Sequence, residues 1–292
     1  MSAVSDRVLT QPALAELANV PATSVWVRSG SVRLHVLDYG PADGVPLVVL
    51  PGITSPAITM DFVARELTDL VRPLVLDIRG RGLSDDAPGA GPLHGYDLDA
   101  YASDVDAVID QLQLSDPVLL GHSMGARIAA KAASSAHGTI LADPPMSHAD
   151  RPYPTTLDTF AAQLDQARRG SDADEVAASW PRWPRREQEL RAGWLASCSR
   201  TAIAATHAGF ESEEFLPLWE KLTGPAVLLF GKDSPVVTPE DVAALAEANP
   251  AHPLVGIENA GHMIFWDEPE PALQALRSAL QDLLAARSPA VP

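Results

Sequence analysis

The stretch PVLLGHSMGARIAA, residues 117–130, decides how this chain folds. Its first part is continuously apolar, which is typical of a β-strand with both faces buried. Its last part has the composition of a helix, and GHSMG at 121–125 joins the two. A serine between two glycines in a sharp strand-to-helix turn, called a nucleophile elbow, exposes its hydroxyl above the edge of a sheet. The pattern predicts that Ser123 is a nucleophile carried by a parallel α/β sheet.

The same alternation of strand and helix continues on both sides of this turn. Strands are predicted at 24–30, 31–40, 46–52, 73–80, 117–123, 138–145, 225–231 and 253–259. Helices are predicted at 55–70 with Ser55 as N-cap, at 97–114, 124–135, 238–250 and near 269–286, and residues 1–22 hold at most a short helix. Strands that alternate with helices form a parallel sheet covered on both faces. We expect an α/β fold with a mostly parallel, eight-stranded sheet flanked by helices.

Residues 146–222 interrupt this alternation. They contain no strong strand pattern and are rich in proline, arginine and tryptophan. We therefore expect a helical cap at 146–222, inserted into a core made of 1–145 and 223–292.

Composition restricts the class of protein. The chain has 292 residues and a formal net charge of −17, which repels phosphate backbones and anionic lipid. No apolar run approaches the length of a membrane span, and the N-terminus lacks the pattern of a secretory signal. Cys198 is the single cysteine, so no intrachain disulfide is expected. We expect a cytoplasmic monomer or homodimer without nucleic-acid or membrane partners.

A nucleophilic serine needs a base and an acid that orients the base. His262, in the loop ENAGHMIFW after the last predicted strand, is the expected base because this loop and Ser123 belong to the same edge of the sheet. Two carboxylates compete for the role of acid. Asp143 ends the strand that follows the elbow helix, and Asp233 lies in GKDSPVV at 231–237, one residue before the position that an acid usually takes, which here is Ser234.

The backbone supplies the expected oxyanion donors. The N–H of Met124 lies at the start of the elbow helix, and the N–H of Ile53 lies in the loop after the strand at 46–52. The sequence contains no H-E-x-x-H and no paired C-x-x-C motif, so we expect neither a metal nor a cofactor.

Four segments together resemble a known family. They are LPGITSPAIT (50–59), LDIRGRGLSD (76–85), LLGHSMGARIAA (119–130) and LADPP (141–145), and they resemble the ring-cleavage amidohydrolases of nicotinate and pyridoxine catabolism in the α/β-hydrolase superfamily. The resemblance implies that the acid is Asp143, because this subgroup places it in the segment that matches LADPP. It also implies cofactor-free hydrolysis of a small anionic N-acyl amide, by deformylation.

A substrate that bears carboxylates needs cationic side chains, and arginine binds carboxylates with two parallel hydrogen bonds. The predicted cap contains Arg151, Arg168, Arg169, Arg182, Arg185, Arg186, Arg191 and Arg200, of which we expect one or two to face the pocket. Our candidates for substrate binding are Ser55, Arg127, Trp180, Arg182 and Trp183.

Two other functions fit the same residues. The first is a carboxylesterase or C–C bond hydrolase that uses the same triad. The second is a non-catalytic ligand-binding protein with the hydrolase fold, against which the complete set of serine, histidine and acid argues.

Overall fold

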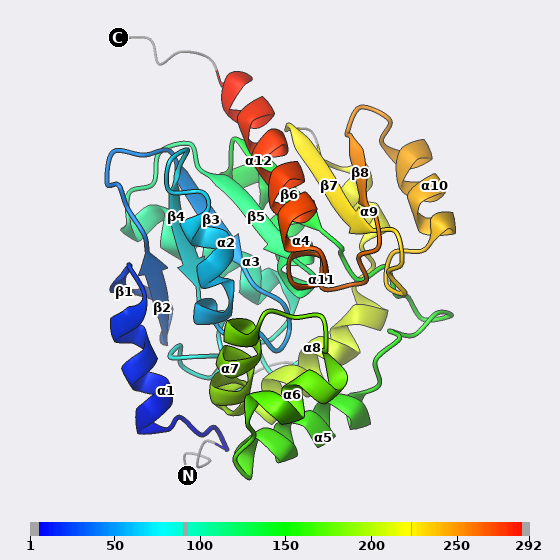
Figure 1. Cartoon of the computed structure of the whole chain (residues 1–292). Coiled ribbons are helices and arrows are strands. Elements are labelled where there is room, and N and C mark those ends of the chain that lie inside the picture. Colours follow the sequence, from blue (N-terminus) through cyan, green and yellow to red (C-terminus); the bar gives the residue numbers. More distant parts are fainter. Residues whose placement is uncertain (1–5, 90–92, 223, 288–292) are drawn as a thin grey trace.

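One sheet of eight strands forms the centre of the computed structural model, which describes residues 6–89, 93–222 and 224–287 (Figure 1). The spatial order is β1-β2-β4-β3-β5-β6-β7-β8. The strands are β1 (Thr23–Ser29), β2 (Val32–Asp38), β3 (Pro46–Leu50), β4 (Arg72–Leu76), β5 (Val118–His122), β6 (Gly138–Ala142), β7 (Ala226–Gly231) and β8 (Leu254–Ile257). β2 pairs antiparallel with β1 and β4, and the other neighbours pair parallel, so the predicted sheet is confirmed.

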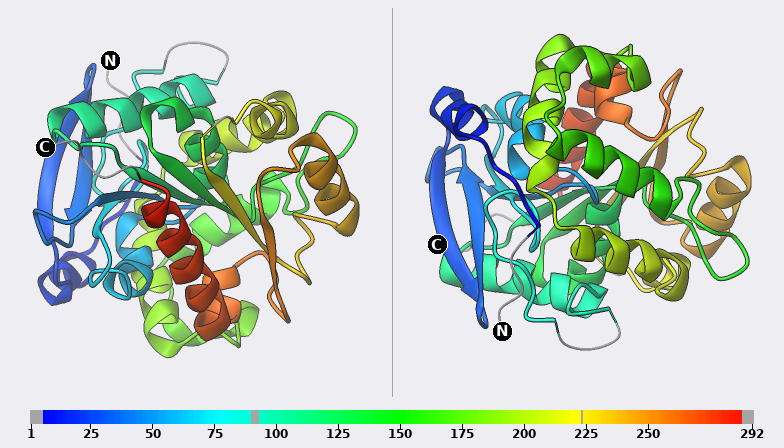
Figure 2. Two further views of the ribbon diagram at one scale, coloured as in Figure 1. Left: turned by 90° about the horizontal axis from the view of Figure 1, so that it is seen from above. Right: turned by 90° about the horizontal axis from the view of Figure 1, so that it is seen from below.

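Helices cover both faces of this sheet (Figure 2). One face packs against α3 (Leu98–Gln111), α4 (Met124–Lys131) and α10 (Pro239–Ala248), with the 3-10 turn η3 (Ala133–Ser135) after α4. The opposite face packs against α2 (Asp61–Arg65), α11 (Ile264–Asp267) and α12 (Pro269–Ala285). Because side chains alternate along a strand, Val48 of β3 belongs to the first core and Val49 to the second.

Helix α3 has the apolar face that its sequence predicts. Tyr101, Val105 and Val108 are buried in the core, and Ile109 and Leu112 pack against it. The spacing of these residues puts them on one side of a 3.6-residue helix.

Residues 55–70 do not form the single helix that we predicted, and Ser55 is not its N-cap. The segment starts with the 3-10 turn η2 (Ala57–Met60), continues into the five residues of α2, and has Pro56 rather than Ser55 before its first helical residue. The Asp77 carboxylate, from the turn after β4, accepts the N–H of Ala57 at 2.6 Å. A distant side chain therefore supplies the cap that the sequence led us to expect from Ser55.

Between β6 and β7, the described residues form helices and one isolated β-bridge between His148 and Arg151, with no strand. The helices are α5 (Leu157–Arg168), α6 (Ala173–Ser179), α7 (Arg185–Trp194), η4 (Leu195–Ser197), α8 (Arg200–Ser212) and α9 (Leu216–Glu220). Helices α5 to α8 lie together at one end of the sheet (Figures 1 and 2), whereas α9 contacts α4 and α10 of the core. The division into a core and a cap with boundaries at 146 and 222 stays a prediction, and residues 1–5, 90–92, 223 and 288–292 lie outside the described residues.

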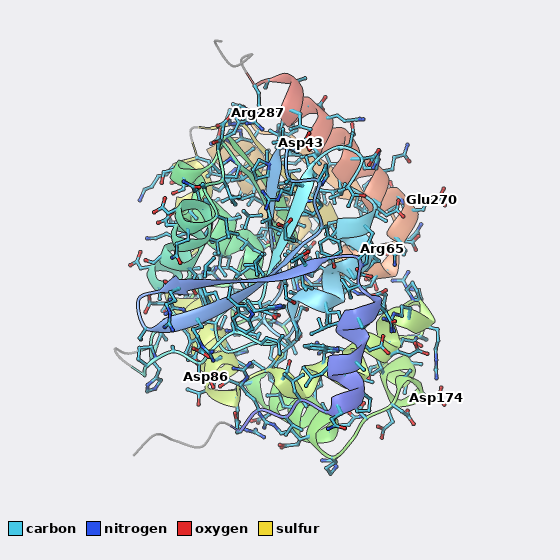
Figure 3. The ribbon with its side chains drawn as sticks, turned by 90° about the vertical axis from the view of Figure 1, so that its left-hand side faces the viewer. Asp43, Arg65, Asp86, Asp174, Glu270 and Arg287 are labelled. Carbon is cyan, nitrogen blue, oxygen red and sulfur yellow. The ribbon has the colours of Figure 1, made fainter. Side chains whose placement is uncertain are left out.

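The N-terminal helix α1 (Gln11–Glu16) contacts α7 and leads through η1 (Leu17–Asn19) into β1; Figure 3 views the molecule from this side. Asp43, Asp174 and Glu270, which are labelled in that view, are exposed acidic residues. Among the helices of the described residues, none combines the length and the apolar character that a membrane crossing requires.

Candidate active site

The turn between β5 and α4 holds Ser123 in a strained conformation. Its φ of 56° and ψ of −121° lie outside the regions that residues with a side chain prefer, and the residue is 2% exposed. A Cβ atom on Gly125 would lie 1.8 Å from the carbonyl oxygen of Leu50, and one on Gly121 would lie 2.1 Å from that of Gly125. The two glycines therefore allow β3, β5 and α4 to approach closely enough to form the turn.

This close approach makes Gly125→Ala strongly destabilising. The added methyl group meets backbone rather than a flexible side chain, so we expect the free energy of unfolding in urea to fall by about 3 kcal/mol or more. The control is Gly193→Ala in α7, where the nearest atom to an added Cβ is 3.8 Å away. There, replacing a helical glycine should raise stability by about 0.5–1 kcal/mol. Equal effects at the two positions would contradict this view of the elbow.

Three side chains meet at the C-terminal edge of the sheet in the arrangement of a Ser-His-Asp catalytic triad. The Oγ of Ser123 lies 2.9 Å from Nε2 of His262, and Nδ1 of His262 lies 2.7 Å from Oδ2 of Asp143. Since a carboxylate only accepts, Nδ1–H donates to Asp143 and leaves Nε2 free to accept from the serine hydroxyl. Asp143 is fully buried, whereas the side chain of His262 is 17% exposed.

Asp143, and not Asp233, is the carboxylate that reaches His262. Asp143 follows β6 directly and accepts two further hydrogen bonds, from the N–H of Gly231 at 2.9 Å and from the hydroxyl of Ser234 at 2.7 Å. Asp233 is exposed, and its carboxylate has no hydrogen bond or ion pair with any residue that the structure describes. The residue that stands where an acid usually does, Ser234, therefore supports the carboxylate of the neighbouring strand.

The two expected oxyanion donors belong to buried residues, Ile53 in the wall of the cavity and Met124 directly after Ser123. Across the described parts of the chain, the N–H groups of Ile53 and Met124 donate to no protein acceptor. A hydrogen bond holds the loop that carries Ile53 in place, because Nε of the buried Arg81 donates to the Ile53 carbonyl oxygen at 3.1 Å. The segment 77–85, which follows β4, thus helps to hold one oxyanion donor in place.

A cavity of about 510 Å³, counting its mouth, opens above Ser123. Its walls are Gly52, Ile53, Thr54, Ser55, His122, Ser123, Tyr153, Thr155, Phe160, Gln163, Trp180, Trp183, Arg191, His262 and Met263. Three of the expected substrate-binding residues, Ser55, Trp180 and Trp183, are in this wall. The rings of the two tryptophans stack, with their centroids 4.8 Å apart.

The other two expected substrate-binding residues, Arg127 and Arg182, do not line this cavity. Arg127 points from α4 toward α8, where Nη1 donates to the carbonyl oxygen of Phe210 at 3.1 Å and the guanidinium lies over the Phe210 ring. Arg182 is half exposed and pairs with Glu268 at 3.4 Å. The structure therefore does not bring either arginine to the cavity wall: Arg127 is buried but points toward Phe210, and Arg182 points toward Glu268 at the surface.

Arg191 of α7 supplies the positive charge instead. Its Nη1 donates to the carbonyl oxygen and the hydroxyl of Thr54 at 2.7 and 2.8 Å, and its Nη2 donates to Gln163 at 3.1 Å. No carboxylate among the described residues pairs with it. Burial lowers the pKa of Arg191, but a guanidinium remains charged at neutral pH. Sequence reasoning named Arg191 only as one of eight arginines.

A helical signal could have singled out Arg191. Glu187, Leu190 and Trp194 of α7 are all buried, and together with Arg191 they follow the spacing i, i+3, i+4, i+7. This spacing puts Arg191 on the inward face of its helix, whereas Arg185 and Arg186 belong to the outward face.

Two further residues of the site were missed. The hydroxyl of Tyr153 lies 3.2 Å from Nε2 of His262. The ring of His122 lies 5.3 Å from that of His262, and its Nε2 donates to the His262 carbonyl oxygen at 3.0 Å. Burial, together with the nearby His262, lowers the pKa of His122 to about 3, so its ring is neutral.

Known proteins are similar to this chain in both sequence and architecture. Residues 47–275 match the alpha/beta hydrolase family. The chain is 38% identical over 247 residues to the N-formylmaleamate deformylase of Pseudomonas putida, a match that covers 83% of this chain and 90% of that protein. It is 26% identical over 279 residues to the 2-(acetamidomethylene)succinate hydrolase of Mesorhizobium japonicum, covering 90% and 96%.

A solved structure agrees with these sequence matches. The crystal structure of an N-formylmaleamic acid deformylase variant from Pseudomonas putida superimposes with a TM-score of 0.78 at 37% identity, over 87% of this chain and 99% of that one. With the family match over most of its length and this likeness in both sequence and structure, the chain belongs to the alpha/beta hydrolase family.

Proposed function

We propose that this protein is a serine amidohydrolase that cleaves the C–N bond of a small N-acyl compound bearing a carboxylate, with N-formylmaleamate as the reference substrate. The observation that carries the proposal is the position of Arg191. This position puts a guanidinium that pairs with no carboxylate of the described residues in the wall of the same cavity as Ser123 and His262, in a chain of net charge −17. The similarity to a deformylase and to a second amide-cleaving hydrolase supports the choice of bond.

In the proposed mechanism, His262 takes the hydroxyl proton of Ser123 as the oxygen attacks the substrate carbonyl carbon. Asp143 holds the imidazole in the tautomer that accepts this proton and stabilises the imidazolium that forms. The N–H groups of Ile53 and Met124 donate to the oxyanion of the tetrahedral intermediate. Because these donors belong to a buried turn and a fixed loop, little reorganisation is needed when the charge develops.

The substrate's carboxylate is held by Arg191 while the chemistry takes place at Ser123. The rings of Trp180, Trp183 and Phe160 give the cavity apolar walls, which keep water away from a small ligand. Collapse of the intermediate breaks the C–N bond, and the nitrogen-containing product leaves with the proton that His262 took from Ser123. Water then attacks the acyl-enzyme with His262 as base and releases the acid, which is formate for an N-formyl substrate.

Kinetics on a panel of substrates test this function. We expect formate release from N-formylmaleamate with kcat/KM above roughly 10⁴ M⁻¹ s⁻¹, the lower end of the usual range for a good enzyme substrate. The panel also holds p-nitrophenyl esters and a ring-fission diketone. Preference for an ester or a C–C bond would replace the proposal with those activities, and failure of a fluorophosphonate to label Ser123 would favour a binding protein.

Replacing Arg191 tests its role directly. Arg191→Met keeps the length of the side chain and removes the charge, so we expect KM for the carboxylate substrate to rise about 10- to 100-fold, the usual worth of hydrogen bonds to a charged group. Hydrolysis of a neutral ester should change much less.

The matched control is Arg185→Met on the outward face of the same helix, where the arginine pairs with Asp174. This variant should behave as the parent does with both substrates. Parallel losses of amide and ester hydrolysis in Arg191→Met would show that Arg191 only supports the loop of Thr54.

The location, the partners and the oligomeric state of the enzyme are also part of the proposal. A single cysteine that is buried fits a reducing cytoplasm, and the acidic composition fits a protein whose partner is its small substrate rather than nucleic acid or a membrane. We propose a monomer or homodimer without cofactor.

A further inference from the structure

The hydroxyl of Tyr153 points at the reacting atoms, yet the mechanism above gives it no task. Tyr153 lies between β6 and α5, is 5% exposed and lines the cavity. Its oxygen is 3.2 Å from Nε2 of His262, the same nitrogen that faces the Oγ of Ser123 at 2.9 Å.

Surrounding rings fix the position of this hydroxyl. The ring of Tyr153 stacks on Phe160 at 6.3 Å between centroids, contacts Phe210 at 4.9 Å and meets the edge of His207 at 6.1 Å. A phenol has only two side-chain torsions, and packing on several sides restrains both of them. The oxygen is therefore held against His262 rather than free to move through the cavity.

Counting hydrogen bonds shows that the Tyr153 proton must be directed elsewhere. Asp143 takes the Nδ1–H of His262, so neutral Nε2 has one lone pair, and Ser123 donates to it. Tyr153 cannot donate fully to the same lone pair. Burial and the nearby Asp143 carboxylate raise the pKa of Tyr153, against the opposing effect of its contact with Ser123, so the phenol keeps its proton.

We propose that Tyr153 is a catalytic residue that relays the proton from His262 to the leaving nitrogen; this inference rests on the proposed amide hydrolysis. After serine attack, Nε2 carries the serine proton and donates it to the Tyr153 oxygen, while the Tyr153 O–H donates to the substrate nitrogen. As the C–N bond breaks, its electron pair stays on nitrogen, and the oxyanion re-forms the carbonyl. The nitrogen takes the phenol proton and the phenol takes the imidazolium proton, so tyrosine ends unchanged and His262 ends neutral.

Such a relay matters for amides and not for activated esters. A nitrogen leaving group departs only when it is protonated, whereas p-nitrophenolate departs as a stable anion. A positioned proton donor contributes about 10²- to 10⁴-fold to a step that needs one. Tyr153 would thus favour C–N cleavage by a site whose triad is equally able to cleave esters.

The variant Tyr153→Phe keeps the packed ring and removes the relay. We expect kcat for N-formylmaleamate to fall about 100-fold or more, with KM little changed, while kcat/KM for p-nitrophenyl acetate stays within about 3-fold of the parent. The matched control is Tyr96→Phe, which removes a partly buried hydroxyl outside the cavity. Its hydroxyl contacts Asp86 and Ala87, and we expect it to retain both activities.

A series of N-formyl aminobenzoates with increasingly basic nitrogens provides a second measurement that a structural role would not affect. The loss in Tyr153→Phe should grow with the basicity of the leaving nitrogen. A loss shared equally by amide and ester, or a loss independent of that basicity, would overturn the relay and leave the proposed function intact. A parent enzyme that cleaves esters but no amide would overturn both.

Discussion

Ser123→Ala should abolish turnover of every substrate, with kcat falling on the order of 10⁶-fold, as when the nucleophile of a serine hydrolase is removed. The physical reason is that, among the described residues, no other serine or threonine hydroxyl hydrogen-bonds to His262. Ser123 is held at the elbow with φ of 56°, and its Oγ lies 2.9 Å from the base. The phenol of Tyr153 is the other hydroxyl at His262, but its raised pKa makes it a proton donor rather than a nucleophile.

Measuring this effect requires binding and catalysis to be separated. Isothermal titration should show that Ser123→Ala still binds the substrate, because Arg191 and the aromatic walls are untouched. The control is Ser135→Ala, whose hydroxyl bonds to the exposed Asp106 on the outer face of the molecule and should leave kcat as it is. Activity in Ser123→Ala above about one thousandth of the parent would refute covalent catalysis by this residue.

Asp143→Asn should lower kcat about 10⁴-fold, which is the loss expected when the orienting acid of a triad becomes an amide. An asparagine donates through its amide group, so it no longer forces Nδ1 of His262 to carry the proton. It also loses the negative charge that stabilises the imidazolium. The expected loss lies in kcat rather than in KM, because Asp143 does not line the cavity.

Asp233→Asn is the matched control for this change. It makes the same substitution on the other candidate acid, an exposed carboxylate in the neighbouring loop, and should leave kcat within about 2-fold of the parent, since exposed substitutions far from the chemistry have small effects. Steady-state kinetics on both variants decide between the two acids. If Asp233→Asn is the inactive one, the loop at 231–237 must rearrange to bring that carboxylate to His262.

Much of this molecule could be predicted from local patterns. Apolar runs predicted the strands of the core, and the spacing of Tyr101, Val105 and Val108 predicted the buried face of α3. GHSMG between a strand and a helix predicted the elbow. These signals are readable because the periods of strands and helices depend on neighbours within a few residues. The segment at 55–70 departed from its pattern because its cap, Asp77, comes from another part of the chain.

Within the site, the sequence by itself determined which kinds of residue were present: one serine in an elbow, one histidine in the last loop, two carboxylates and many arginines. Only the tertiary structure decided which of them meet. The pairing of β6 with β7 brings Ser234 to Asp143, and the packing of α7 against η2 brings Arg191 to the cavity wall while Arg182 stays outside. The reason is that the partners of a buried charge lie far away in the sequence: helical spacing indicates which face of α7 carries Arg191, but not which residues that face meets.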